Sequence, residues 1–168
     1  MYSPARGQIV RLNLNNNYVT KESIAGYLDK WLGGRGLNQY LLFRELEPGT
    51  APFDPANIIA FGTGLLVGTG APGDARLNID SLNAYTGGGI GSSNVGGNFA
   101  PALRAAGIDH LLIRGKSKNL VYVLIDDGHV EVRKADHLRG LGTIETDKLI
   151  KEELGDSSLQ VLSIGPAG

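Results

Sequence analysis

The sequence contains no cysteine, and this absence excludes several kinds of chemistry. Without a thiol the chain forms no disulfide and offers no thiolate nucleophile, and it cannot by itself hold an iron–sulfur cluster or a structural zinc ion of the usual kind. The three histidines, His110, His129 and His137, are scattered and show no metal-ligand spacing. We therefore expect each histidine to be structural or exposed. Any redox chemistry would need another group to carry the electrons.

The 168 residues also lack an excess of charge of either sign and a long apolar run. The formal net charge is -1, and basic residues alternate with acidic ones, which argues against binding to nucleic acid or to an anionic membrane surface. No window reaches the roughly 20 apolar residues of a membrane span, and the opening MYSPARGQIV lacks the apolar core of a signal peptide. The sequence predicts a cytoplasmic domain with neither nucleic acid nor membrane as partner.

Glycine, by contrast, is abundant, and eight glycines lie between Ala71 and Gly107. Consecutive glycines allow main-chain N–H groups to point at one anion, or allow a flat ligand to approach the main chain closely. Neither phosphate-binding motif is complete, because no Walker lysine follows the glycines and the dinucleotide fingerprint lacks its third glycine. Ordinary turns, bulges and strand crossings are the alternative explanation.

The first half of the chain predicts strands and helices in alternation. Alternating apolar residues indicate strands, the i, i+3, i+4 pattern indicates helices, and a short apolar run bounded by turn residues indicates a buried strand. The expected elements are a strand over 8–14, a strand from Tyr18, a helix from Ser23 to Leu32 ended by Gly33-Gly34, a helix over 37–46 and a buried strand over 58–62.

The second half predicts a helix over 101–107 capped by Gly107, then a strand over 110–115. Asp127-Gly128 stands between two alternating segments, which is the strongest hairpin signal in the chain. A helix over 145–154 and a strand over 159–165 are expected to follow. Since a buried strand and a turn normally continue into further structure, we expect the sequence to end inside a larger unit.

The apolar strand exits IIAFGTGLLVGTGAP and VLSIGPAG are loosely alike. They indicate either two related halves with pseudo-twofold symmetry or two ordinary strand exits.

Two places could bind an anionic ligand. Gly96-Gly97 precede the predicted helix, where free amides and the helix dipole favour an anion, although many helix starts hold only water. Arg76 lies in a polar loop entering a strand, where a guanidinium could grip a planar or phosphate edge, or simply be solvated. No acid–base pair or nucleophile elbow is evident. The sequence thus offers binding positions and no residue that would perform chemistry alone.

Several ordered segments resemble the N-terminal domain of the aldehyde ferredoxin oxidoreductase family, the tungsten or molybdenum bis-pterin enzymes. The resemblance covers nearly the whole chain, and four segments carry it. They are RGQIVRLNL with YLDKWLGGRGLNQYLLFREL, the proline-rich connection PGTAPFDPANIIAFGTGLLVGTGAPGDAR, SNVGGNFAPALRAAGIDHLLIRGKS, and the terminal SIGPAG.

The resemblance implies an α+β fold in which two β-sheets with flanking helices form a base for the cofactor. That cofactor is a pair of pterins joined by Mg²⁺ between their phosphates, with tungsten or molybdenum held by dithiolene sulfurs. Arg76 matches the family arginine between pterin and iron–sulfur cluster. Asn94, Val95, Gly96 and Gly97 match the pterin-binding NSGG segment, and the main chain of Asn94 is implied to help hold the Mg²⁺.

The chain departs from the family pattern at Val95, which replaces a serine, and at Asn98 and Ala100. In the family the four cysteines of the 4Fe–4S cluster and the proton-transfer residues lie farther along the chain, so no catalytic residue is expected here. Residues 1–168 are therefore expected to be an incomplete cofactor-binding domain.

The expected partners are the remainder of the enzyme or a complementary subunit, a ferredoxin-type electron carrier and an aldehyde substrate, in an oligomer. Two alternatives stay open. One is a non-catalytic module that binds a phosphate-bearing ligand or a partner chain, and the other is a family member that acts on a different substrate.

Overall fold

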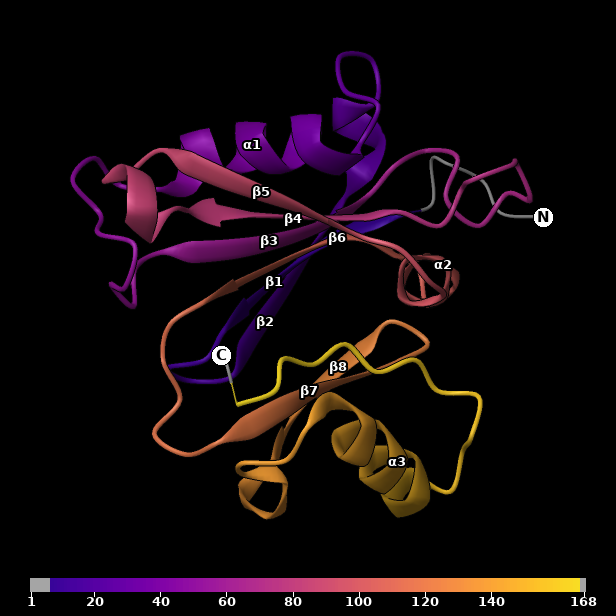
Figure 1. Ribbon diagram of the computed structural model, residues 1–168. Coiled ribbons are helices and arrows are strands. Elements are labelled where there is room, and N and C mark those ends of the chain that lie inside the picture. The colour runs from indigo at the N-terminus through magenta and orange to yellow at the C-terminus, as the bar shows by residue number, and fades with distance from the viewer. Residues whose placement is uncertain (1–6, 167–168) are drawn as a thin grey trace.

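A mixed six-stranded sheet forms the centre of the computed structural model, which describes residues 7–166 (Figure 1). The strand order is β2-β1-β6-β3-β4-β5. β1 and β6 run parallel, and every other neighbouring pair is antiparallel. The strands are β1 (Gln8–Asn13), β2 (Tyr18–Ser23), β3 (Ile58–Thr63), β4 (Leu77–Leu82), β5 (Ile90–Val95) and β6 (Ile108–Arg114).

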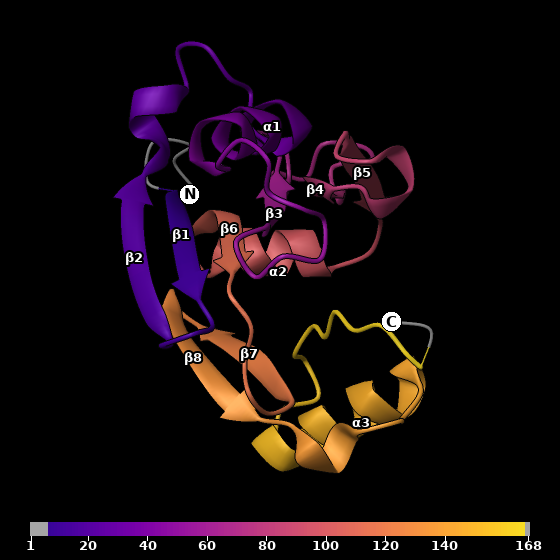
Figure 2. The ribbon, with the colours of Figure 1, turned by 90° about the vertical axis from the view of Figure 1, so that its left-hand side faces the viewer.

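Each face of this sheet has its own hydrophobic core. On one face α1 (Gly34–Glu45) buries Leu37, Leu41 and Leu42 against the strands. On the other face α2 (Phe99–Ala105) and the second sheet pack against the strands. Figures 1 and 2 show α1 on one side of the sheet and α2, β7, β8 and α3 on the other. Burial of both faces explains why the first five residues of β6 are all buried, although Asp109 and His110 are among them.

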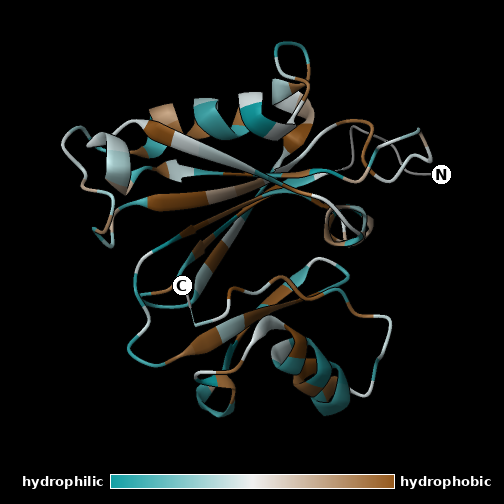
Figure 3. Ribbon diagram, in the orientation of Figure 1, coloured by the Kyte–Doolittle hydropathy of each residue, from teal (hydrophilic) through white to brown (hydrophobic). Residues whose placement is uncertain are grey.

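The second sheet is a two-stranded hairpin made of β7 (Val121–Asp126) and β8 (His129–Lys134). Asp127 and Gly128 both have positive φ angles, 43° and 79°, as the two central residues of a type I′ turn require. α3 (Thr143–Leu154) packs Ile150 beside this hairpin, and hydrophobic residues line the strands in Figure 3. The α+β fold with two sheets, the hairpin and this helix are confirmed.

The helix predicted from Ser23 to Leu32 is wrong. Only a 3₁₀ helix, Ile24–Tyr27, forms there, with the Ser23 hydroxyl accepting a hydrogen bond from the amide of Ala25. Gly26 disfavours helix propagation in this short segment. The glycine pair has the opposite role to the one expected, because Gly33 is the N-cap of α1 and Gly34 is its first residue.

The strand predicted over 159–165 is also wrong, since none of these residues is in a strand. A strand needs a hydrogen-bonding neighbour, and no strand within residues 7–166 pairs with this segment. The apolar residues still pack, because Leu162 contacts the core between the two sheets and Val161 contacts the α3 cluster. Ala167 and Gly168, which end the SIGPAG segment, lie outside the described residues.

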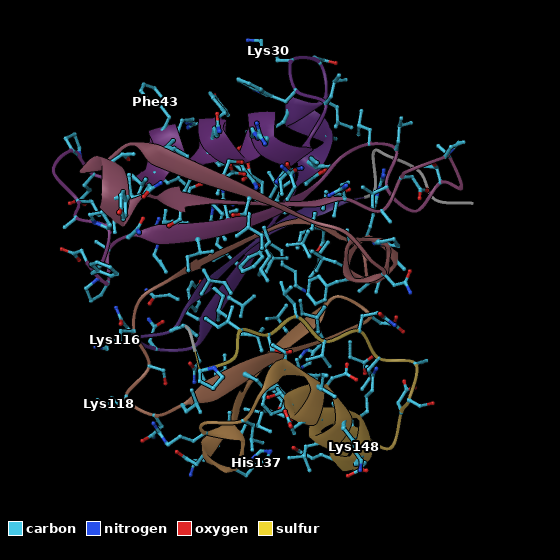
Figure 4. The ribbon with its side chains drawn as sticks, viewed as in Figure 1. Lys30, Phe43, Lys116, Lys118, His137 and Lys148 are labelled. Atoms are coloured by element: carbon cyan, nitrogen blue, oxygen red, sulfur yellow. The ribbon has the colours of Figure 1, made fainter. Side chains whose placement is uncertain are left out.

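Several lysine side chains lie apart from one another in the structure. Figure 4 shows the labelled lysines at separate places, with Lys30 near α1, Lys116 and Lys118 on the connection from β6 to β7, and Lys148 on α3. Within residues 7–166, no helix combines the length and the apolar character needed to cross a membrane.

Candidate functional site

The antiparallel pair β4–β5 brings the predicted binding residues together. Leu77 pairs with Val95, and Asn78 pairs with Asn94. Arg76 immediately precedes Leu77 and Gly96 immediately follows Val95, so both lie at the same end of the strand pair. Two segments that are twenty residues apart in the sequence thus form one site, which we call the β4–β5 end (Arg76 and Asn94–Gly97).

The main chain at the β4–β5 end is open to a ligand. β5 is an edge strand, so alternate residues direct their N–H and C=O groups away from β4, and either Asn94 or Val95 does so. Asn94, Gly96 and Gly97 are exposed, and a Cβ atom added to either glycine would have no other heavy atom within 4 Å. A flat or phosphate-bearing group can therefore approach the backbone here.

Gly97 sets the direction of the chain as it leaves β5. Its φ angle is 100°, a conformation that side chains with a Cβ rarely adopt, and α2 begins two residues later. The N-cap residue Asn98 makes no side-chain cap hydrogen bond. The first amides of α2 consequently retain donor capacity next to the exposed glycines.

Arg76 supplies the positive charge of the site. Its side chain is exposed, and within residues 7–166 it makes no ion pair or hydrogen bond. The carboxylate nearest in sequence, Asp74, instead accepts a hydrogen bond from the amide of Gly70 at 2.8 Å. The Arg76 guanidinium thus keeps its donors for an external acceptor, and a planar fork of donors suits phosphate or a heteroaromatic edge.

Behind the site, on the α1 side of the sheet, lies a buried polar network. The side-chain nitrogen Nδ2 of Asn38 donates to the main-chain oxygen of Ala60 at 3.1 Å and to Asp80 Oδ2 at 2.8 Å. The other side-chain atom, Asn38 Oδ1, lies 2.7 Å from His110 Nδ1. Since Asn38 Oδ1 can only accept, His110 Nδ1 carries the proton. Burial lowers the pKa of His110 to about 3, so the imidazole is neutral. The network joins α1 to β3, β4 and β6.

The other two histidines belong to no metal-binding group within residues 7–166. His129 is exposed at the start of β8, and His137 Nε2 lies 3.1 Å from Glu153 Oε2 at the surface (Figure 4). Across residues 7–166, no three His, Asp or Glu side chains come close enough together to hold a metal ion. At the β4–β5 end, the Arg76 side chain and the exposed main chain can therefore bind and orient a ligand.

Sequence reasoning named Arg76 and Asn94–Gly97 as candidates but missed the structure that supports them. β5 escaped prediction because IGSSNV is polar and shows little alternation. The buried pair Arg104–Asp109 and the Asn38 network were also missed, since a charged or amide side chain normally predicts an exposed position. The one available signal was an arginine within the otherwise apolar helix PALRAAG.

Comparison with known proteins relates the chain to one family. A family model described as "Aldehyde ferredoxin oxidoreductase, N-terminal domain" matches residues 9–168. The chain is 42% identical over 163 residues to the tungsten-containing aldehyde ferredoxin oxidoreductase of Thermococcus kodakarensis, and 41% identical over 163 residues to the enzyme of the same description from Pyrococcus abyssi. Each alignment covers 96% of this chain and 27% of the relative.

A solved structure has the same fold. The active-site complex BamBC of benzoyl coenzyme A reductase, determined with 1,5-dienoyl-CoA, superposes with a TM-score of 0.92 at 36% identity. The match covers 98% of this chain and 25% of that one. The chain therefore spans about a quarter of the length of the relatives that it matches.

Proposed function

Because the chain belongs to the aldehyde ferredoxin oxidoreductase family, as its N-terminal domain, we propose that it cradles a tungsten–pterin cofactor in an enzyme that interconverts aldehydes and carboxylic acids. The observation that carries this proposal is the β4–β5 end, where an exposed arginine with no partner within residues 7–166 stands beside open glycine backbone. The fit is chemical as well as geometric, since a pterin is flat and bears a phosphate.

The proposed roles follow from the donors and acceptors at the β4–β5 end. Arg76 would hold a phosphate or the pterin edge through its guanidinium, and the glycines would let the pterin lie against the main chain. A main-chain oxygen at Asn94 would bind Mg²⁺ between the pterin phosphates, where few protein ligands are needed because phosphate and water supply the others. The cofactor, when bound, supplies the electron transfer for the aldehyde–acid conversion.

Tungsten and the aldehyde substrate are favoured over the alternatives by the relatives' names. Four curated relatives between 39% and 42% identical are tungsten-containing aldehyde ferredoxin oxidoreductases. Two further matches carry other names, an aliphatic sulfonate oxidoreductase subunit at 34% identity and the benzoyl coenzyme A reductase complex. Similar domains thus occur in proteins with different names, and we propose that the remainder of the enzyme forms the substrate pocket.

The proposal also assigns the iron–sulfur cluster to that remainder, because this chain has no cysteine. Electrons would leave through a ferredoxin-type carrier in the cytoplasm.

Native mass spectrometry of the protein purified without air from its own source tests the proposal. We expect an assembly heavier than this chain that contains tungsten and pterin. Protein at the mass of the chain alone, with neither tungsten nor pterin, would overturn the proposal and favour a non-catalytic module.

Substitution of Arg76 then tests the site within the same assembly. Loss of a charge-assisted hydrogen bond to the cofactor should lower tungsten and pterin occupancy about tenfold in Arg76→Gln. Arg139→Gln is the matched control, because the Arg139 side chain is 70% exposed and lies in the connection between β8 and α3, outside the β4–β5 end. Equal tungsten and pterin occupancy in both variants would show that Arg76 does not bind the cofactor.

A further inference from the structure

The side chain of Arg104, on α2, is one of the most buried charged groups in the described chain. It is 2% exposed, and its Nε lies 3.2 Å from Oδ1 of Asp109, which is equally buried at the start of β6. Its Nη1 donates to main-chain oxygens of the turn that follows β3, at 2.9 Å to Gly64 and 2.7 Å to Val67, and also to Leu65.

These contacts give hydrogen-bond donors to carbonyl groups that no strand or helix pairs. Residues 64–67 lie outside the strands, so Leu65 has no strand partner for its carbonyl group. Buried carbonyl groups require a donor, and a guanidinium offers several donors in one plane. Asp109 balances the charge that this arrangement places inside the protein.

The position of Arg104 in the chain links this pair to the β4–β5 end. From Gly64 the chain passes through Arg76 into β4, returns along β5 to Gly96, and enters α2. The hydrogen bond from Arg104 to Gly64 spans forty residues and closes this path into a ring. One side chain therefore ties the segment that leads into Arg76 to the helix that follows the glycines.

Two further contacts hold the same turn in place. The amide of Leu65 donates to the main-chain oxygen of Leu32 at 3.3 Å, next to a bridge between Gly33 and Gly64. Val67, 5% exposed, belongs to the same hydrophobic cluster as Leu103 of α2. The turn is thus fixed between the start of α1 and α2, and the guanidinium is its polar attachment.

We propose that Arg104 and Asp109 are positioning residues of the β4–β5 end, which hold the 64–67 turn on α2 and so fix Arg76 beside Gly96. The identity of the ligand at the β4–β5 end rests on the proposed function above. The role of Arg104 and Asp109 in holding the 64–67 turn rests only on contacts within this chain.

Residue-resolved hydrogen exchange by NMR on the full 168-residue chain tests this proposal without any cofactor. The reporting amides are Leu65, Val67 and Thr69, which donate to main-chain oxygens in and beside the turn, and the reference amides are those of the β7–β8 hairpin. In Arg104→Gln we expect the reporting amides to exchange about tenfold faster relative to the reference amides, as one lost buried hydrogen bond predicts. The nuclear Overhauser contact between Leu77 and Val95, the strand pair adjacent to Arg76 and Gly96, should weaken in the same variant.

Two more variants keep the test decisive. Arg104→Lys retains the positive charge but has a single nitrogen, so it cannot contact Asp109 and the three carbonyl oxygens through separate atoms as Nε and Nη1 of arginine do. We therefore expect a smaller increase of the same local kind, and this variant carries the test if Arg104→Gln fails to fold. Arg139→Gln should leave every amide unchanged.

A uniform rise across reporting and reference amides would show that Arg104 contributes only to global stability, and unchanged exchange at the turn would show that it holds nothing there. Either result overturns the proposal. Failure to find pterin or tungsten in the purified protein would overturn the proposed function and leave this result intact.

Discussion

Acidification should destabilise the fold through His110, well above the pH at which carboxylates titrate. The imidazole is 0% exposed on β6, between Asn38 and the main chain near Gly33, and burial lowers its pKa from 6.5 to about 3. A proton on Nε2 would place a charge where no described residue accepts a hydrogen bond from that atom. The native state therefore excludes a proton that the unfolded chain accepts.

The sign and size of the effect follow from proton linkage. Above pH 6.5 His110 is neutral in both states, and its contribution to stability is complete. Below pH 6.5 the unfolded chain binds one more proton than the native chain, so the free energy of unfolding falls by up to about 1.4 kcal/mol per pH unit until the native pKa is reached near 3. Between pH 6 and pH 5 we expect a loss of about 1 kcal/mol.

Urea unfolding at half-unit steps from pH 7 to pH 5 measures this slope with little interference from carboxylates. His110→Gln keeps a hydrogen-bonding side chain beside Asn38 but does not titrate, so its slope should be smaller than that of the wild type by the amount stated. His129→Gln, which replaces an exposed histidine of the same chain, is the matched control variant. The reasoning fails if His110→Gln has the wild-type slope, or if NMR titration places the pKa of His110 near 6.5.

Two stability predictions concern the packing around α1. Gly62→Ala should lower the free energy of unfolding by about 1–3 kcal/mol, because the new Cβ would overlap Asn38 Oδ1 and lie 2.7 Å from His110 Nδ1; urea unfolding with unchanged stability would show that the network can shift. Leu41→Ala, at a side chain 1% exposed, should cost about 2–5 kcal/mol in thermal and urea unfolding. Phe43→Ala, on the same helix but 83% exposed, is the control and should change stability by less than about 0.5 kcal/mol.

Local signals in the sequence were sufficient where a single turn or helix determines the structure. Asp127-Gly128 fixes its own hairpin, because few residues other than Asp, Asn and Gly adopt the positive φ angles of a type I′ turn. The helix predicted from Ser23 to Leu32 did not form, although the apolar spacing satisfies a helix and Ser23 caps its start, because Gly26 disfavours propagation beyond one turn. The spacing of apolar residues alone does not show whether a glycine will end the helix early.

The parts that could not be predicted depend on contacts between distant segments. The segment over 159–165 has strand-like composition, but it forms no strand within the described chain because strand formation is a property of a pair. The proximity of Arg76 to Gly96 likewise depends on the register of β4 and β5, which no residue at the site encodes alone. Arg104 would have been predicted on the surface, since its burial depends on Asp109 and on three carbonyl groups elsewhere in the chain.

The place of β6 in the sheet also determines when the domain can fold during synthesis. β6 lies between β1 and β3, and its pairing with β1 joins Gln8 to Ile108. The β1–β2 hairpin ends at Ser23, so about 85 further residues are synthesised before β6, its neighbour in the sheet, begins at Ile108. Until Arg114 has emerged, β1 and β3 both present unpaired edges, and such edges recruit other chains. Insertion of β6 between β1 and β3 is therefore the step that completes the six-stranded sheet, and the β7–β8 hairpin can pack against the sheet only after it.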